Sequence, residues 1–170
     1  MVIAAIFLIV PLCLAFAALN DLFTMTIPNR ISAILMASFL VVAPLSGMDM
    51  QTFGMSLIAG LAVFCVSFIL FAMNTMGGGD AKLLTASAVW FGFDMPLALY
   101  MLAVAILGGV LTMGILFIRS YRQEIMVTGL PVPDSLLVAK KVPYGIAIAA
   151  AGLLTYPEAP IVQLAMQRLM

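Results

Sequence analysis

Residues 50–82 read MQTFGMSLIAGLAVFCVSFILFAMNTMGGGDAK, and this stretch decides the class of fold. No charged side chain occurs from Met50 to Gly79. A helix that crosses the hydrocarbon core of a bilayer needs about 20 consecutive, mostly apolar residues. The stretch is therefore long enough to span a membrane, and it ends at three glycines followed by the charged residues Asp80 and Lys82.

The rest of the chain has the same character. Hydrophobic residues make up 65% of the 170 residues and charged residues only 8%, whereas a soluble protein carries about 25% charged residues. A soluble fold of this composition cannot cover itself with polar groups, so the bilayer must be part of its solvent. The seven basic and seven acidic residues form no basic run, so we expect no nucleic-acid binding.

The numbers of histidines and cysteines limit the kinds of catalytic and metal sites that the chain can form. The chain has no histidine, which excludes Ser-His and Cys-His catalytic pairs and removes the commonest metal ligand. The two cysteines, Cys13 and Cys65, lie in separate apolar runs and form no Cys-x-x-Cys motif. We therefore expect buried structural thiols and no metal site.

The few charges divide the chain into six apolar segments. The fourth is short unless Asp80 and Lys82 occupy the first turn of a helix whose polar end lies at the membrane surface. We expect an all-α integral membrane protein, a six-transmembrane-helix bundle with residues 1–170 forming one domain. The expected helices cover roughly residues 2–20, 31–47, 54–74, 80–94, 96–119 and 143–165.

The basic residues predict the orientation of these six spans. Loops rich in Lys and Arg stay in the cytoplasm. On the opposite side only Arg168 is found, so we expect both termini outside and a cytoplasmic loop at about residues 119–142. Because no basic residue precedes Val2, the first segment is expected to be a span, not a cleaved signal peptide. The residues of the cytoplasmic side are Arg30, Lys82, Arg119, Arg122, Lys140 and Lys141.

The seven acidic residues are not equivalent. Asp21 follows the first apolar run and Asp80 opens the fourth, so the topology places both at the same depth on the inner side. An ionisable group at a helix end can be a simple anchor, but within a membrane it is a functional hypothesis. Solvation is the expected role of the other five: Asp49, Asp94, Glu124, Asp134 and Glu158.

The glycines before Asp80 admit two interpretations. Gly77, Gly78 and Gly79 allow backbone conformations closed to other residues, and a bare glycine edge can receive an extended peptide. They also suit a flexible turn before a helix, with Asp80 as an ordinary N-terminal residue favoured by the helix dipole. Pro28-Asn29 suits the turn before the second helix, which any helix hairpin requires.

Two close carboxylates can cleave a peptide bond without a metal or cofactor. They cannot both ionise easily, so one keeps the proton while the other activates a water. The alternatives are a small ion- or proton-coupled transporter that uses Asp21 and Asp80, or a non-catalytic assembly subunit. A transporter usually binds its ion near the midplane, whereas both acids here are expected at one edge. Gly108-Gly109 suits an interface between subunits or ordinary tight packing.

Three motifs in order resemble a known family. Asp21 followed by Ile27-Pro28-Asn29, then Gly77-x-Gly79-Asp80, is similar to the type IV prepilin peptidases, which are Gly-x-Gly-Asp (GxGD) aspartic proteases of the membrane. Pro143-Tyr144-Gly145 is similar to the Pro-Tyr/Phe-Gly motif on the family's last helix. The short form looks most like the TadV/CpaA branch, which serves Flp-type pili.

The resemblance implies a function and a site. Asp21 and Asp80 would cut the short basic leader from prepilins and pseudopilins, next to the substrate's hydrophobic helix, at the cytoplasmic side of the bacterial inner membrane. The pilus assembly machinery and membrane lipid are the implied partners, with no cofactor. Residues expected to bind substrate or shape the site are Gly77, Gly78, Gly79, Lys82, Pro28, Asn29, Pro143, Tyr144 and Gly145.

The chain departs from the family in two places. Longer relatives carry an insertion with two Cys-x-x-Cys pairs and also methylate the new N-terminus. The insertion is missing here, so neither methylation nor S-adenosylmethionine binding is predicted. Relatives commonly have basic residues between the first Asp and Ile-Pro-Asn, where this chain has Phe23-Thr24-Met25-Thr26.

Overall fold

The computed structural model describes residues 2–121, 123–124, 133–137, 139 and 141–169, and within them every regular element is a helix. The all-helical prediction is therefore confirmed for this part of the chain. Part of the expected cytoplasmic loop at about 119–142 lies outside the described residues. The elements are α1 (Val2–Thr24), α2 (Asn29–Leu45), α3 (Met50–Ala72), α4 (Gly78–Phe91), α5 (Met95–Ser120), α7 (Asp134–Leu137), α8 (Gly145–Thr155), η1 (Tyr156–Glu158) and α9 (Pro160–Gln167).

Three helices, α1, α3 and α5, are long and apolar enough to cross a membrane, which makes the chain a multi-pass membrane protein. The α8–η1 segment and α9 together make a fourth candidate span, bent by 41°. Helix α4 has 14 residues, which at a rise of 1.5 Å per residue gives about 21 Å, less than the hydrocarbon thickness of about 30 Å. Six spans with outer termini thus remain a prediction.

The last apolar segment is not the continuous helix expected at 143–165. Helix α8 ends at Thr155, a single 3₁₀ turn follows, and α9 starts at Pro160. Pro157 and Pro160 have no N–H to donate, and Ala159 takes the extended backbone favoured before a proline, with φ −63° and ψ 136°. The prediction of one continuous helix rested on apolar composition, which gives no indication of this break between α8 and α9.

The first helix is longer than expected. Helix α1 continues beyond residue 20 to Thr24 and ends where Met25 adopts a left-handed conformation with φ 54°. Asp21 therefore lies inside the helix, one turn before its end, and not after it. A charge ends an apolar run in the sequence, but it does not end a helix when the fold supplies a partner for it.

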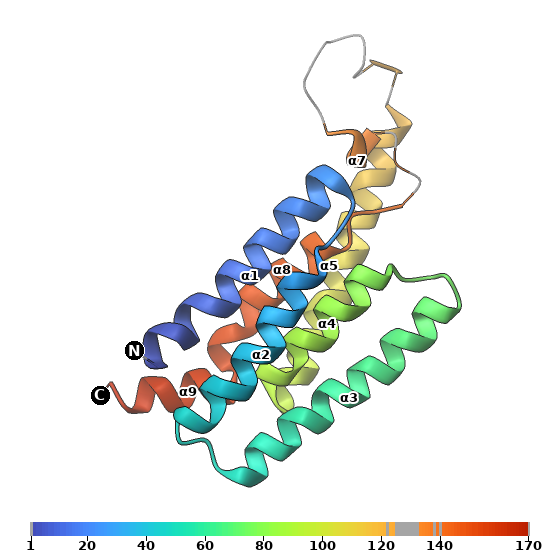
Figure 1. Ribbon diagram of the computed structural model, residues 1–170. Coiled ribbons are helices and arrows are strands. Elements are labelled where there is room, and N and C mark those ends of the chain that lie inside the picture. Colours follow the sequence, from blue (N-terminus) through green and yellow to red (C-terminus); the bar gives the residue numbers. More distant parts are fainter. Residues whose placement is uncertain (1, 122, 125–132, 138, 140, 170) are drawn as a thin grey trace.

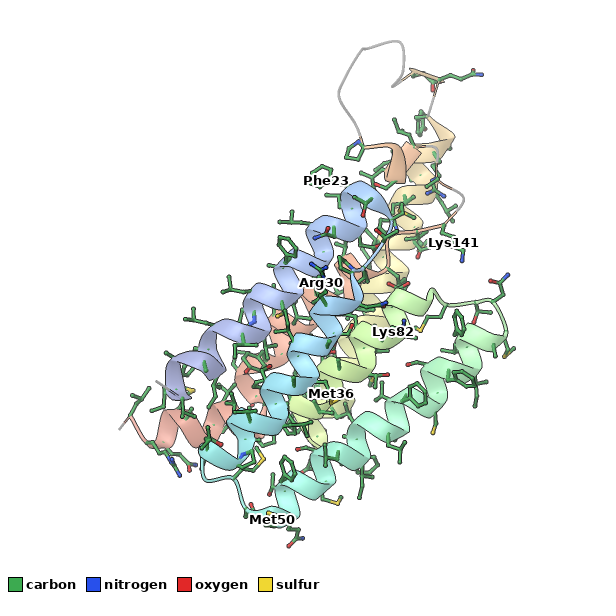
Figure 2. The ribbon with its side chains drawn as sticks, in the orientation of Figure 1. Phe23, Arg30, Met36, Met50, Lys82 and Lys141 are labelled. Atoms are coloured by element: carbon green, nitrogen blue, oxygen red, sulfur yellow. The ribbon has the colours of Figure 1, made fainter. Side chains whose placement is uncertain are left out.

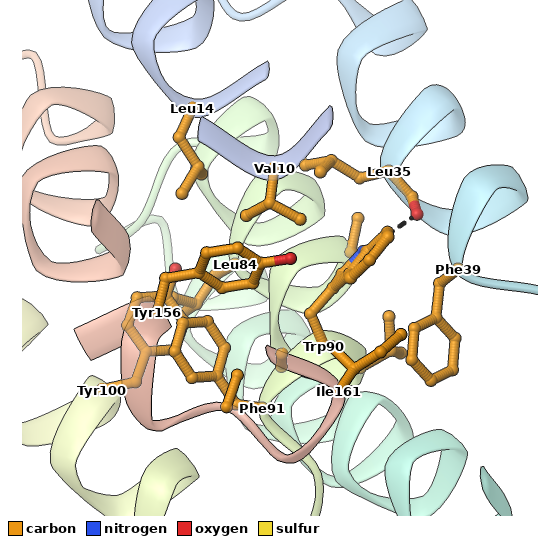
Figure 3. Packing of buried hydrophobic residues seen from close by; sticks show 14 of the residues in the cluster. Val10, Leu14, Leu35, Phe39, Leu84, Trp90, Phe91, Tyr100, Tyr156 and Ile161 are labelled. Atoms are coloured by element: carbon orange, nitrogen blue, oxygen red, sulfur yellow. Dashed lines mark hydrogen bonds between the residues drawn. The ribbon is translucent and has the colours of Figure 1, made fainter. Parts of the chain in front are cut away.

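Helix α4 is the centre of the bundle. It packs against α2, α3 and α8, and Figure 1 shows α2 and α3 on either side of it. Trp90 of α4 is buried, donates from Nε1 to the carbonyl of Leu35 at 3.1 Å, and meets Phe39 edge-on (Figure 3). The neighbouring Phe91 stacks on Tyr100 at 4.2 Å. This aromatic core fixes α4 relative to α2 and α5.

The bundle has two chemically different ends. Arg30, Lys82 and Lys141 lie toward one end, and Met50 marks the other (Figure 2). Arg168 lies against Gly47, at the end of α2 far from Arg30. The basic residues that the sequence predicted on the cytoplasmic side therefore lie at one end of the bundle, as far as the structure describes them.

Candidate active site

Asp21 is buried near the C-terminus of α1, with 5% of its surface exposed. Its Oδ2 accepts a hydrogen bond of 2.7 Å from the backbone N–H of Gly145, the first residue of α8. The first N–H groups of a helix have no partner within the helix. The contact satisfies such a donor and ties α1 to α8 at the carboxylate.

Gly145 leaves the space that Asp21 occupies. A Cβ atom at Gly145 would lie 2.9 Å from Oδ2 of Asp21 and 2.8 Å from Cδ1 of Ile27. Both distances are shorter than those real Cβ atoms show. The glycine of the Pro143-Tyr144-Gly145 motif is therefore required by the close approach of the α1 carboxylate, and Pro143 is buried beside it.

Asp80 lies in the first turn of α4, which begins at Gly78 with Gly77 as N-cap. A carboxylate there is favoured by the helix dipole. The glycines before it face neighbours within the protein. A Cβ would come within 2.7 Å of Oδ2 of Asp80 at Gly77, 3.2 Å of the Phe71 ring at Gly78 and 3.1 Å of Ile27 at Gly79.

Both aspartates line one cavity of about 330 Å³. A second cavity of about 430 Å³ lies on the other side of Asp80 and reaches Leu70 of α3 and Thr112 of α5. The two share Gly77, Asp80, Lys141 and Val142, so Asp80 stands between them. The other residues that line the first cavity are Asp21, Met25, Thr26, Ile27, Asn29, Gly78 and Gly79.

Asn29 and Lys82 form a brace between two helices. Nζ of Lys82 donates to Oδ1 of Asn29 at 2.9 Å, joining the first turn of α4 to the start of α2. Asn29 also lines the aspartate cavity, whereas Lys82 lines a separate groove beside it. Pro28 is the N-cap of α2 and lines neither.

The position of the Tyr144 ring explains why residue 108 is a glycine, for which the sequence allowed two interpretations. Tyr144 lines the second cavity with Asp80, and its hydroxyl donates to the carbonyl of Val104 at 3.4 Å. Its ring lies directly over Gly108 of α5, where any Cβ would overlap it. The neighbouring Gly109 faces open space. Gly108 therefore makes room for Tyr144, a residue that the family resemblance predicts at the site.

Arg119 organises the described part of the loop next to the cavity. Its guanidinium donates to the carbonyls of Leu136 at 3.0 Å, Ser135 at 3.0 Å and Lys141 at 2.9 Å. The Ser135 hydroxyl in turn donates to the carbonyl of Leu22 on α1. Sequence reasoning used Arg119 only to orient the helices, because its carbonyl partners lie up to 22 residues away.

Comparison with known sequences identifies one family. Residues 8–113 match the sequence model of the type IV leader peptidase family, which is more than half of the chain. The match includes both aspartates and Gly77 to Gly79, but not the Pro143-Tyr144-Gly145 segment. Neither the curated proteins nor the solved structures give a match.

Proposed function

The chain belongs to the type IV leader peptidase family, and from this we propose that it is an aspartic endopeptidase in which Asp21 and Asp80 remove the leader of a prepilin. The membership itself makes the protein a membrane peptidase for prepilin-type substrates. The observation that carries the proposed mechanism is the single cavity that the two carboxylates line. They come from α1 and α4, so only the folded bundle brings them together.

The proposed chemistry is hydrolysis by a shared-proton pair. The ionised carboxylate takes a proton from a water, and the water oxygen attacks the scissile carbonyl. The protonated carboxyl donates a hydrogen bond to the developing oxyanion. Collapse of the tetrahedral intermediate breaks the C–N bond, and the leaving amine takes up the proton that the first carboxylate removed from the water. The Gly145 N–H holds one oxygen of Asp21 in place, which leaves the other oxygen for the water.

The proposed location is the cytoplasmic face of the inner membrane. The cavity includes Lys141 and lies at the end of the bundle that carries Arg30 and Lys82. Basic residues near the ends of spans favour the cytoplasm. A six-span arrangement with outer termini, in which α8 and α9 form one bent span, is consistent with this end being inside.

The proposed substrate is a Flp-type prepilin. This rests on the resemblance of the short form to the TadV/CpaA branch. A transporter receives less support, because both acids lie near one end of the bundle and not at its midplane.

Co-expression with an epitope-tagged Flp-type prepilin tests the proposal. Leader removal is followed on a gel for the wild type and for Asp21→Asn and Asp80→Asn, which keep the shape but remove the ionisable group. Each change is expected to lower the cleavage rate by about 10²–10⁴-fold, the usual contribution of an acid–base group.

The matched control is Asp94→Asn. Asp94 is also a carboxylate at a helix N-terminus, where it caps α5 by accepting from the Met95 N–H at 2.8 Å. Asparagine caps equally well, so cleavage should be unchanged. Wild-type cleavage by either active-site variant, at equal membrane levels, would show that the two aspartates are not a catalytic pair.

A further inference from the structure

The two cavities that meet at Asp80 are surrounded by different helices. The aspartate cavity is lined by α1, the α1–α2 connection, the first residue of α2, the first turn of α4 and the segments on either side of Asp80 and before α8. The second cavity is lined by Leu70 of α3, Thr112 of α5 and Tyr144, together with the connection from α3 to α4. Within the described residues, neither α3 nor α5 lines the aspartate cavity. A peptide that passes Asp80 therefore lies in a different helical environment on each side.

The aspartate cavity is closed toward the interior of the bundle. Helices α1, α2, α4 and α8 form a packed ring, because α1 packs against α2, α2 against α4, α4 against α8, and α8 against α1. Ala17, Ile31 and Leu83 lie within about one turn of the residues that line this cavity, and they are 0%, 5% and 0% exposed. A helix that lies in the membrane cannot reach the aspartate cavity from below without separating the ring.

The second cavity lies between two helices that do not pack on each other. Helix α3 packs against α4, on the outer side of the ring (Figure 1), and α5 packs mainly against α8. Both are long and apolar enough to cross a membrane. Ile69 and Met113, the neighbours of two lining residues, are 57% and 75% exposed. An apolar helix can therefore approach the second cavity between α3 and α5 while the ring stays packed.

The charges around the two cavities also differ. Two carboxylates, those of Asp21 and Asp80, line the aspartate cavity together with one cation, Lys141. The second cavity has only Asp80 and Lys141 as charged lining groups within the described residues. Complementary charge guides a ligand to its site. The excess of carboxylates favours a basic segment in the aspartate cavity, whereas the second cavity has no such excess.

We propose that the aspartate cavity receives the last residues of the leader and that the second cavity receives the first residues of the mature pilin. The scissile bond then crosses Asp80, and the mature hydrophobic helix continues into the bilayer between α3 and α5. This assignment rests on the proposed peptidase function and adds the direction in which the substrate lies. It makes Leu70 and Thr112 the residues that set the size of the first mature side chain.

Leu70 and Thr112 suit this role because they line the second cavity from its two flanking helices. The Thr112 hydroxyl already donates to the carbonyl of Gly108 at 2.7 Å, so the residue offers the substrate space and not a free hydrogen-bonding group. Thr112→Leu reduces this space and Leu70→Ala enlarges it. Thr26→Leu is the equivalent change in the aspartate cavity.

Cleavage of two sets of Flp-type prepilins by the purified full chain tests the assignment. One set carries Ala, Leu or Phe as the first mature residue, and the other carries Gly, Ala or Leu as the last leader residue. Size discrimination in a pocket is worth about 10–200-fold. Thr112→Leu should lower the ratio of kcat/KM for Phe over Ala in the mature set by about tenfold or more, and Leu70→Ala should raise it. Both variants should keep the wild-type ratios in the leader set.

Two further variants complete the comparison. Thr26→Leu should lower the ratio for Leu over Gly in the leader set and leave the mature set unchanged. The matched control is Val110→Leu, which adds bulk to an exposed position about 200° around α5 from Thr112. It should keep the wild-type ratios in both sets.

Photocrosslinking to the wild-type chain gives a second measurement that needs no cavity variant to fold. A benzoylphenylalanine at the first mature residue should be captured by residues 70–76 or by Thr112, and one at the last leader residue by residues 25–29. The reverse pattern, or capture of both probes by the same segment, would overturn the assignment. So would wild-type ratios in both Thr112→Leu and Leu70→Ala. Failure of the aspartate pair would instead appear as wild-type cleavage by Asp21→Asn or Asp80→Asn, so the two failures are distinguishable.

Discussion

Replacing Gly145 by alanine would push a methyl group into the side chain of Asp21. The new Cβ would lie 2.9 Å from Oδ2 of Asp21, whereas ordinary contacts begin near 3.4 Å. Its other neighbour, Cδ1 of Ile27 at 2.8 Å, is the end of a flexible side chain and can rotate away. The carboxylate cannot do so cheaply, because the Gly145 N–H itself holds it at 2.7 Å.

The stability change is the balance of three effects. Losing a hydrogen bond to a carboxylate costs about 1.5–3 kcal/mol, and overpacking costs about 1–3 kcal/mol. Alanine in place of glycine in a helix returns about 0.5–1 kcal/mol, and Gly145 has no positive φ that would oppose it. At the centre of these ranges the loss is about 3–4 kcal/mol, or less if Ile27 absorbs the shift.

The effect on cleavage should be separable from stability. A carboxylate displaced by up to about 1 Å can lower the rate about a hundredfold. Gly145→Ala is compared with Gly109→Ala and Gly114→Ala on α5, where a Cβ meets nothing within 4 Å. Prepilin cleavage per inserted molecule and thermal unfolding in detergent are measured for all three, and the two α5 variants should behave like the wild type in cleavage.

One result would refute this reasoning. If Gly145→Ala cleaves prepilin at the wild-type rate per inserted molecule, the approach of α8 to Asp21 does not position the carboxylate. An equal loss of cleavage in Gly109→Ala would also refute it, since a general sensitivity of the bundle to added methyl groups would then explain the effect.

The remaining predictions concern packing around the site and in the core. Gly108→Ala should displace the Tyr144 ring and lower prepilin cleavage by about tenfold or more through this positioning group; a normal rate would show that the ring has no role. Ser87→Ala should cost about 1–3 kcal/mol in thermal unfolding, because it leaves the buried Tyr100 hydroxyl, now 2.8 Å from Ser87, without that partner. Adding Tyr100→Phe should recover most of the loss, and non-recovery would contradict the pairing.

Helix α5 was located best by the sequence, at 96–119 against the observed Met95–Ser120. Asp49 and Asp94 cap α3 and α5 by accepting from Thr52 and Met95 at 2.8 Å. Sequence reasoning gave both acids a solvating role only, and their capping role was missed. The end of α1 was predicted too early because the charged Asp21 was taken to end the helix. Its hydrogen-bond partner, the Gly145 N–H, is known only from the structure.

The roles of the candidate site residues stay a prediction, and the structure adds how some of these residues are placed. Asp21, Asp80 and the glycines were singled out from motifs, and they line a common cavity. The sequence could not show that Gly145 makes room for Asp21, or that Gly108 makes room for Tyr144. The two residues of each pair lie far apart in the chain, and no local sequence pattern connects them. Lys82 was expected at the site, whereas it lines the neighbouring groove and reaches the cavity only through Asn29.

The sequence by itself determined that the chain is helical and resides in a membrane, because 65% of its residues are hydrophobic and its uncharged runs have the length of about 20 residues that a membrane-spanning helix needs. It also placed basic residues and two acids toward one end. Only the tertiary structure decided that Asp21 and Asp80 share a cavity and that the last apolar segment is broken. The bond from Gly145 to Asp21 joins residues 124 positions apart, and such contacts depend on how whole helices pack, which local composition does not encode.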